Sequence, residues 1–429
     1  MRVRLLSPAV LALLCGNVVW AADPVQPKAM HKATVTSSGL QYLGAIKVPL
    51  QVDDNAYGAL ALRTYPNGIK TFFIVGKTTA GTHAFEFTNP APGRNLSVAP
   101  RATLVRAWGD IYQGHRTWPT FSSGQLETEG LFWLGGDTLL WVYGHNYDVT
   151  PGSKPVVGIT KFNPNGSISA YGPWKADIDA HHLRNYGVAV PSWFAKSYTG
   201  GRGLALGAGI ESGASKASFG PGLFAVDTPN EAFPTSHLLT TRALTFYPEE
   251  PHQQRLHRDA QYRVLNQNGV MLSQATDQFA PPRGGVGFWG SADYIRASTW
   301  IDLPDVQGVL FLGRLGYDNM WYGNTPLPTG IQDPCHCTKG QHASRYAARW
   351  FIYAPADLAK VASGQAASWQ ISPTEVFDPT LLFNVQLNCD KLVTGAAFDP
   401  ETRTVYICAP AVDNARTGRL PVIHAFAVK

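Results

Sequence analysis

Two histidines at the ends of apolar segments are the first residues that could do chemistry. His115 stands in Gly114-His115-Arg116, and His145 follows the apolar run 138–143 and Gly144. An imidazole accepts or donates protons near neutral pH and can also bind metal ions. Neighbouring tyrosine and arginine residues favour a functional role, and a structural hydrogen bond is the alternative. We expect both histidines in a catalytic site.

A second cluster joins a tyrosine to a downstream arginine. Tyr186 begins an apolar segment, and Arg202 follows the turn Gly200-Gly201. A nearby cation lowers the pKa of a tyrosine, which can then carry a proton in a reaction. The two glycines allow the backbone to bring the Arg202 guanidinium close to a ligand carboxylate. The alternative is a surface turn in which the arginine pairs locally.

Polar and aromatic residues next to these candidates are expected to contact a substrate. Tyrosine and tryptophan rings can stack on sugar faces, although most tryptophans of such a chain pack in the core. The residues that we assign to substrate binding are Arg116, Tyr147, Arg184 and Trp193.

The elements that must position these residues are short strands. Apolar or alternating runs of strand length are separated by turns such as 135–137 and 163–166. The segment 354–364, which opens with proline and stops at glycine, predicts a helix. The chain is therefore expected to be all-β, with residues 22–429 forming a single β-propeller of five to seven blades, seven favoured. We expect the final strand, 422–428, to pair near residues 42–48 and close the ring.

Composition narrows the class of protein. The chain has 429 residues, of which 45% are hydrophobic and 15% charged, with a formal net charge of +5. These values exclude a coiled coil, a disordered polymer and a basic nucleic-acid tail. Residues 1–21 resemble a secretory signal, and no later apolar stretch is long enough to span a membrane. We expect a monomer that is secreted or periplasmic.

Four cysteines follow the signal segment. Cys389 and Cys408 flank an expected hairpin, so a disulfide between them is the favoured interpretation. Cys335 and Cys337 are separated by one residue, which is awkward for a disulfide between them. A metal site at this segment is therefore considered as well.

The order of His115, His145, Tyr186 and Arg202 resembles the catalytic group of the propeller-shaped polysaccharide lyases, the ulvan lyases and rhamnose-glucuronate lyases. The resemblance implies β-elimination at a uronic acid of an acidic polysaccharide. Arg202, helped by His115, would neutralise the carboxylate, and His145 and Tyr186 would abstract and return the proton.

The same resemblance implies a structural zinc ion. Its ligands would come from Cys335, Cys337, His342 and His257. In an oxidising compartment, Cys335 or Cys337 could instead pair with Cys389 or Cys408.

Two other functions stay open. One is a propeller hydrolase, either a glycosidase with two carboxylates such as Asp148 and Glu211, or a metal-assisted lactone or ester hydrolase. The other is a carbohydrate or protein binder without catalytic activity.

Overall fold

Strands and tight turns build almost the whole chain. The structure is a computed structural model, and it describes residues 32–52, 58–78, 81–119, 126–145, 148, 150, 152–209, 218, 220–247, 255–258, 264–266, 289, 292–323, 332–335, 340–415 and 419–429. The predicted signal segment, residues 1–21, lies outside the described residues. None of the helices in these ranges is long and apolar enough to cross a membrane.

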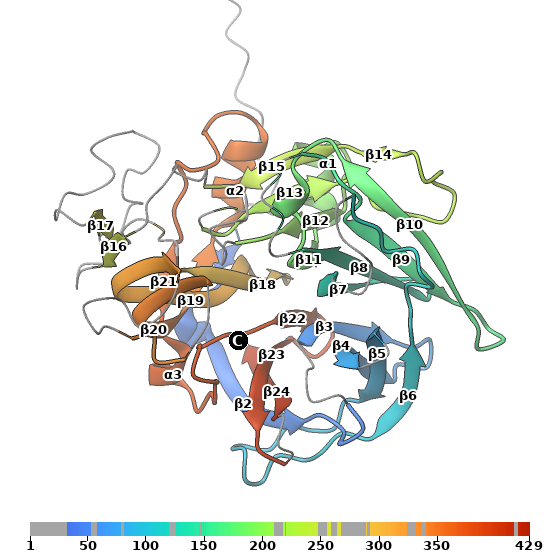
Figure 1. The fold of residues 1–429 in the computed structure, drawn as a ribbon, viewed down its shortest axis with the longest axis horizontal. Coiled ribbons are helices and arrows are strands. Elements are labelled where there is room, and N and C mark those ends of the chain that lie inside the picture. Colours follow the sequence, from blue (N-terminus) through green and yellow to red (C-terminus); the bar gives the residue numbers. More distant parts are fainter. Residues whose placement is uncertain are drawn as a thin grey trace, which may run out of the picture.

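Five sheets stand around a common centre (Figure 1). Blade 1 contains β3 (Gly58–Thr64), β4 (Lys70–Thr78), β5 (Gly81–Thr88) and β6 (Leu104–Gly109). Blade 2 contains β7 (Glu127–Gly135), β8 (Thr138–Gly144), β9 (Val157–Phe162) and β10 (Ile168–Ala176), extended by β14 (Leu238–Leu239). Blade 3 contains β11 (Tyr186–Ala189), β12 (Leu204–Gly207), β13 (Leu223–Val226) and β15 (Thr241–Thr245).

The last two blades differ from the others in how they are completed. Blade 4 contains β18 (Tyr294–Asp302), β19 (Val306–Gly323), β20 (Gly340–Tyr353) and β21 (Glu375–Phe377). Three short strands extend it. β19 also pairs with β1 (Ala33–Thr34) and with β16 (Arg255–Arg258), and β16 pairs with β17 (Val264–Asn266). Blade 5 contains β22 (Gly395–Asp399), β23 (Thr404–Asp413), β24 (Leu420–Val428) and β2 (Leu40–Lys47).

The ring closes through the pairing of the first long strand with the last. β2 runs antiparallel to β24, with Tyr42 opposite Phe426 and Lys47 opposite Val422. The predicted pairing of the last strand near residues 42–48 is therefore confirmed. The innermost strands β3, β7, β11, β18 and β22 then contact one another in sequence around the centre.

The all-β propeller prediction is confirmed, but the favoured blade number of seven is wrong. The ring has five blades because blade 4 uses far more chain than an average blade. β19 and β20 have 18 and 14 residues, and a long connection that carries β16 and β17 precedes β18.

The helices are few and short. The predicted helix is confirmed as α2 (Pro355–Ala362), which has proline in its first turn and is followed by Gly364 at φ 75°. Two helices that the sequence analysis missed are α1 (Ser192–Tyr198) and α3 (Pro379–Leu382). In the part of the chain that the structure describes, two 3-10 turns span Ser37–Gly39 and Ala180–His182.

The core consists of apolar layers between neighbouring blades. One layer joins blades 3 and 4 around Phe311 and Tyr353, and another joins blades 4 and 5 around Trp350 and Phe426. Such close packing leaves little room at the innermost strands. A Cβ atom on Gly130 of β7 would lie 2.7 Å from the carbonyl oxygen of Asn185, which precedes β11.

Gly130→Ala is expected to lower the free energy of unfolding by about 1–3 kcal/mol, because the added methyl overpacks the contact between blades 2 and 3. Gly203→Ala is the matched control, since the atom nearest to its Cβ would be 4.0 Å away. Urea denaturation of both variants checks this prediction. Equal stabilities of the two variants would contradict it.

Candidate functional site

Charged side chains gather at one end of the propeller. We call the end at which the innermost strands begin the N-face, and the end at which they finish the C-face. Burying a charge is costly unless it is paired, so buried charges that cluster at one face mark a candidate site. The N-face residues that are less than a tenth exposed include Arg116, Thr128, His145, Asp148, Lys154, Arg184, Asn185, Asp293, Arg314, Asp333, His342 and Thr394.

His145 and Arg184 lie together at the junction of blades 2 and 3. His145 directly follows β8, whose last residue, Gly144, is paired with the first residue of β7. A Cβ atom on Gly144 would lie 2.8 Å from Cδ of Arg184, so the arginine packs against this strand end. Burial lowers the pKa of His145; the charge of Asp148 opposes this effect and that of Arg184 adds to it. The imidazole is therefore neutral at pH 7 and able to accept a proton.

Asp148 is held in an ion pair. Its Oδ2 accepts from Lys154 Nζ at 2.5 Å and from the indole N–H of Trp118 at 2.5 Å. Burial acts to raise the pKa of Asp148, but the hydrogen bonds from Lys154, the Thr150 backbone and Trp118 outweigh it and lower the pKa. In the alternative with Asp148 and Glu211, the ionised Asp148 suits a base or nucleophile and not an acid. Glu211 lies outside the described residues.

The four residues of the lyase resemblance do not share one site. Tyr186 is 4% exposed, its hydroxyl donates to the carbonyl of Gly222 at 2.7 Å, and burial raises its pKa well above the usual value. Tyr186 is the first residue of β11 and lies at the N-face. Leu204 pairs with Ala189, the last residue of β11, so Arg202, two residues before Leu204, lies beyond the C-face end of this strand.

Arg202 is bound locally at the C-face. Its guanidinium donates to the carbonyl of Thr199 at 2.7 Å and to the carbonyl of Thr240 at 3.2 Å, and it forms an ion pair with Asp227 at 3.3 Å. The lyase prediction is therefore wrong, because the arginine needed for the uronate carboxylate and the tyrosine needed for proton transfer lie at opposite ends of a strand.

The remaining predicted residues divide between the two faces. His115 Nδ1 is 3.0 Å from the carbonyl of Gly172, and Arg116 donates to Thr128 at 3.1 Å next to the start of β7. Trp193 lies in α1, beyond the C-face end of β11, and its indole N–H donates to Asp302 at 3.2 Å. Tyr147 lies outside the described residues.

The cysteines form a different bridge from the favoured one. Cys335 is bonded to Cys389, which is one of the pairings that we left open, and Cys408 carries a free, buried thiol whose pKa burial raises to about 12. The predicted disulfide between Cys389 and Cys408 is wrong, and Cys335 is removed from the predicted zinc ligands. Cys337 lies outside the described residues.

The other predicted zinc ligands lie on different strands. His257 is on β16, opposite Asn319 of β19. His342, on β20, places its Nδ1 2.9 Å from Oδ2 of Asp333. In the described ranges, no group of three or more histidine, cysteine, aspartate or glutamate residues is placed to hold a metal ion.

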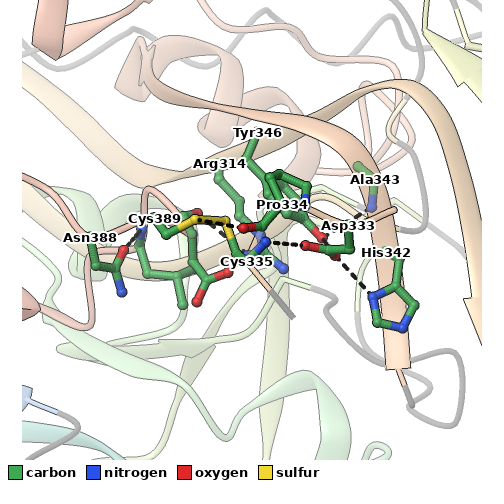
Figure 2. Close-up of a disulfide and its surroundings, with 11 residues drawn as sticks. Arg314, Asp333, Pro334, Cys335, His342, Ala343, Tyr346, Asn388 and Cys389 are labelled. Atoms are coloured by element: carbon green, nitrogen blue, oxygen red, sulfur yellow. Dashed lines mark hydrogen bonds and ion pairs between the residues drawn. A yellow bond between two sulfur atoms is a disulfide. The ribbon is translucent and has the colours of Figure 1, made fainter. Parts of the chain in front are cut away.

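The disulfide anchors a polar network at the junction of blades 4 and 5 (Figure 2). Asp333 accepts from the hydroxyl of Tyr346 at 2.5 Å, from His342 and from the backbone N–H of Cys335. The Tyr346 ring lies under the guanidinium of Arg314, with 4.0 Å between the ring centroid and Cζ. The bridge thus fixes the chain beside Arg314.

Two carboxylates accept hydrogen bonds from β19, at Arg314 and Gly316, which are two positions apart in this strand. Oδ1 of Asp390, the residue after Cys389, accepts from Arg314 at 3.2 Å. Oδ1 of Asp293, just before β18, accepts from the backbone N–H of Gly316 at 2.9 Å. β18 and β22 are neighbouring innermost strands, so the two carboxylates come from adjacent blades and meet at β19. Neither carboxylate was predicted from the sequence, although each precedes a strand.

Comparisons with known proteins name no family for this chain. No family model matches it, and no curated protein matches it by sequence. A glycosyl hydrolase from Bacteroides ovatus matches with a TM-score of 0.40 and 12% identity over 92% of this chain and 96% of that one. A mannose phosphorylase from Leishmania mexicana matches with a TM-score of 0.36 and 8% identity over 92% and 89%. These likenesses are low and show no function for this chain.

Asp148→Asn is expected to lower the free energy of unfolding at pH 7 by about 3 kcal/mol, because the buried Lys154 ammonium loses its partner. The folded pKa of Asp148 is depressed, so its stabilisation is present above the unfolded pKa of about 3.9 and is lost as the pH falls toward the folded pKa. Urea denaturation at pH 7, 5 and 3 should show a difference from wild type that shrinks at pH 3.

Glu231→Gln serves as the control for this variant. Glu231 pairs with Lys161 at the surface, where solvent screens an ion pair and its contribution to stability is small. Two results would contradict the stabilising ion pair between Asp148 and Lys154. One is a loss of unfolding free energy in Asp148→Asn that is no larger than in the control. The other is a loss that is the same at pH 7 and pH 3.

The double variant Cys335→Ala with Cys389→Ala removes the disulfide. Its free energy of unfolding is expected to fall by about 2–4 kcal/mol, because the bridge closes a loop with a sequence separation of 54 residues. Thermal melting with and without dithiothreitol provides the test. The reductant should lower the Tm of the wild type and leave that of the double variant unchanged. Identical melting of the oxidised wild type and the variant would be the opposing result.

Proposed function

We propose that this chain is a carbohydrate-active enzyme that cleaves glycosidic bonds at the N-face, with Asp293 and Asp390 as its two carboxyl groups. The observation that carries the proposal is the attachment of both groups to β19, at Gly316 and Arg314, where blades 4 and 5 meet. Glycosidases generally use one carboxyl group as an acid and a second as a base or nucleophile.

The surroundings of each carboxyl group divide the two roles. The Arg314 guanidinium is fully buried and favours the charged form of Asp390, which suits a base or nucleophile. Asp293 is itself fully buried, and its Oδ1 accepts from a backbone N–H. With Asp390 as the charged group, the remaining role, delivery of a proton to the leaving oxygen, falls to Asp293.

The rest of the N-face suits a polyhydroxylated substrate. Arg184 offers several N–H donors, Asn185 offers both a donor and an acceptor, and the neutral imidazole of His145 can do either. Their burial supports a rigid site that is formed before the substrate arrives. An acidic polysaccharide remains a proposed partner, since Arg116 and Arg184 are both at this face.

Asp293→Asn and Asp390→Asn are expected to reduce kcat by about 10²- to 10⁴-fold with little change in KM, because each removes a group that acts in the transition state. The measurement is reducing-sugar release from a panel of neutral and acidic polysaccharides, together with release of nitrophenol from aryl glycosides. Asp305→Asn is the matched control, since Asp305 pairs with Arg403 at the surface.

The outcomes separate the proposal from its alternatives. Hydrolysis by the wild type that survives in both variants would show that these carboxyl groups are not catalytic. Binding of a polysaccharide without any bond cleavage by the wild type would favour a non-catalytic binder. A product that absorbs in the ultraviolet through a new double bond would also contradict hydrolysis.

A further inference from the structure

The segment that carries Asp390 crosses from blade 4 to blade 5 without helix or strand. It runs between Val385 and Val393, which are buried in the apolar layer that joins these two blades. Within it, the backbone N–H of Leu392 donates to Oδ1 of Asn388 at 3.1 Å, which fixes the turn around Asp390. The contacts that hold this turn against the two blades therefore also set the position of the Asp390 carboxylate.

Each blade makes its own attachment to this segment. On the side of blade 4, the disulfide ties Cys389 to the connection between β19 and β20, and Arg314 of β19 donates to Asp390. On the side of blade 5, the carbonyl oxygen of Gln386 lies 2.9 Å from Nε2 of His424, a residue of β24. A carbonyl oxygen can only accept a hydrogen bond, so Nε2 of His424 carries a proton and is the donor.

His424 lies on the face of blade 5 that packs against blade 4. It is fully buried, and Phe426, two residues later on the same face of β24, belongs to the apolar layer between the blades. Burial lowers the pKa of His424 to about 4, and the hydrogen bond to the Gln386 carbonyl acts against this shift. The imidazole is therefore neutral at pH 7. Because its proton is on Nε2, its Nδ1 is an acceptor.

Tyr42 supplies the donor for this nitrogen. Its hydroxyl lies 3.0 Å from Nδ1 of His424, and 5.8 Å separates the centroids of the two rings. Burial raises the pKa of Tyr42 to about 12, so the hydroxyl keeps its proton and donates the hydrogen bond. Tyr42 thereby favours the tautomer of His424 that donates to Gln386. Because Tyr42 belongs to β2, the strand that closes the ring also acts on the segment before Asp390.

We propose that Tyr42 and His424 are positioning residues for the Asp390 carboxylate. They hold the carbonyl of Gln386 against blade 5, while the disulfide and Arg314 hold the same segment against blade 4. Asp390 is thus fixed from both of the blades between which it lies. This inference rests on the proposed function for the part that Asp390 plays in the reaction, but the attachment itself can be tested without a substrate.

Hydrogen–deuterium exchange of the full chain tests the attachment. His424→Leu removes both hydrogen bonds, so the amides of residues 387–392 should exchange about 3- to 10-fold faster than in the wild type. His424→Gln keeps an N–H that can donate to the carbonyl of Gln386, and its exchange should match the wild type. The amides of β4, in blade 1, are the internal reference and should not change in either variant.

Steady-state kinetics test the consequence for the reaction. With a polysaccharide that the wild type hydrolyses, His424→Leu should lower kcat by about 10- to 100-fold with little change in KM, because a displaced carboxylate acts on the transition state. His424→Gln should restore most of this loss, and Tyr42→Phe should lower kcat by a smaller factor. Tyr406→Phe is the matched control, since the hydroxyl of this other blade 5 tyrosine accepts from Asn89 at 3.1 Å.

The outcomes distinguish this inference from the proposed function. Wild-type exchange of residues 387–392 in His424→Leu would overturn the inference, and so would a wild-type kcat in that variant. Equal losses in His424→Gln and His424→Leu would also overturn it, because the role would then not depend on the donated hydrogen bond. A wild type that cleaves no glycosidic bond would overturn the proposed function, and the exchange rates would still decide whether His424 holds the segment.

Discussion

The structure depends on the pairing of β2 with β24. This ladder joins residues near the two ends of the described chain and turns five sheets into a ring. Once the ring is closed, the innermost strands must all begin at one face, because each blade repeats the same strand order from the centre outward. Residues that precede these strands, such as Arg184, Asp293 and Asp390, are thereby brought to one axis although they are far apart in sequence.

The cost of collecting charges at this face is offset by specific partners. Lys154 neutralises Asp148, Arg314 neutralises Asp390, and Asp333 accepts three hydrogen bonds. The bridge between Cys335 and Cys389 holds Asp333 and Asp390 against the paired strands β19 and β20 (Figure 2). Rigidity of this kind is what a site needs when its carboxyl groups must keep a fixed separation during a reaction.

Local sequence signals predicted the strands, the helix at α2 and the closing strand, because turn residues and alternation are local properties. Blade number depends on how much chain each blade consumes, and the length of β19 and β20 has no local signal. The partner of Cys335 depends on which connections meet at the N-face. Tyr186 and Arg202 are close in sequence, yet β11 and α1 carry them to opposite ends of blade 3, which periodicity does not reveal.

The central claim is that Asp293 and Asp390 face one substrate at the N-face. A crystal structure of the Asp390→Asn variant soaked with the oligosaccharide that the wild type cleaves tests it most directly. The account predicts a sugar ring whose glycosidic oxygen lies within hydrogen-bond distance of Asp293, with the substituted side chain at position 390 on the other side of the scissile bond. A sugar bound only at the C-face, or on the outer surface of the blades, would contradict it.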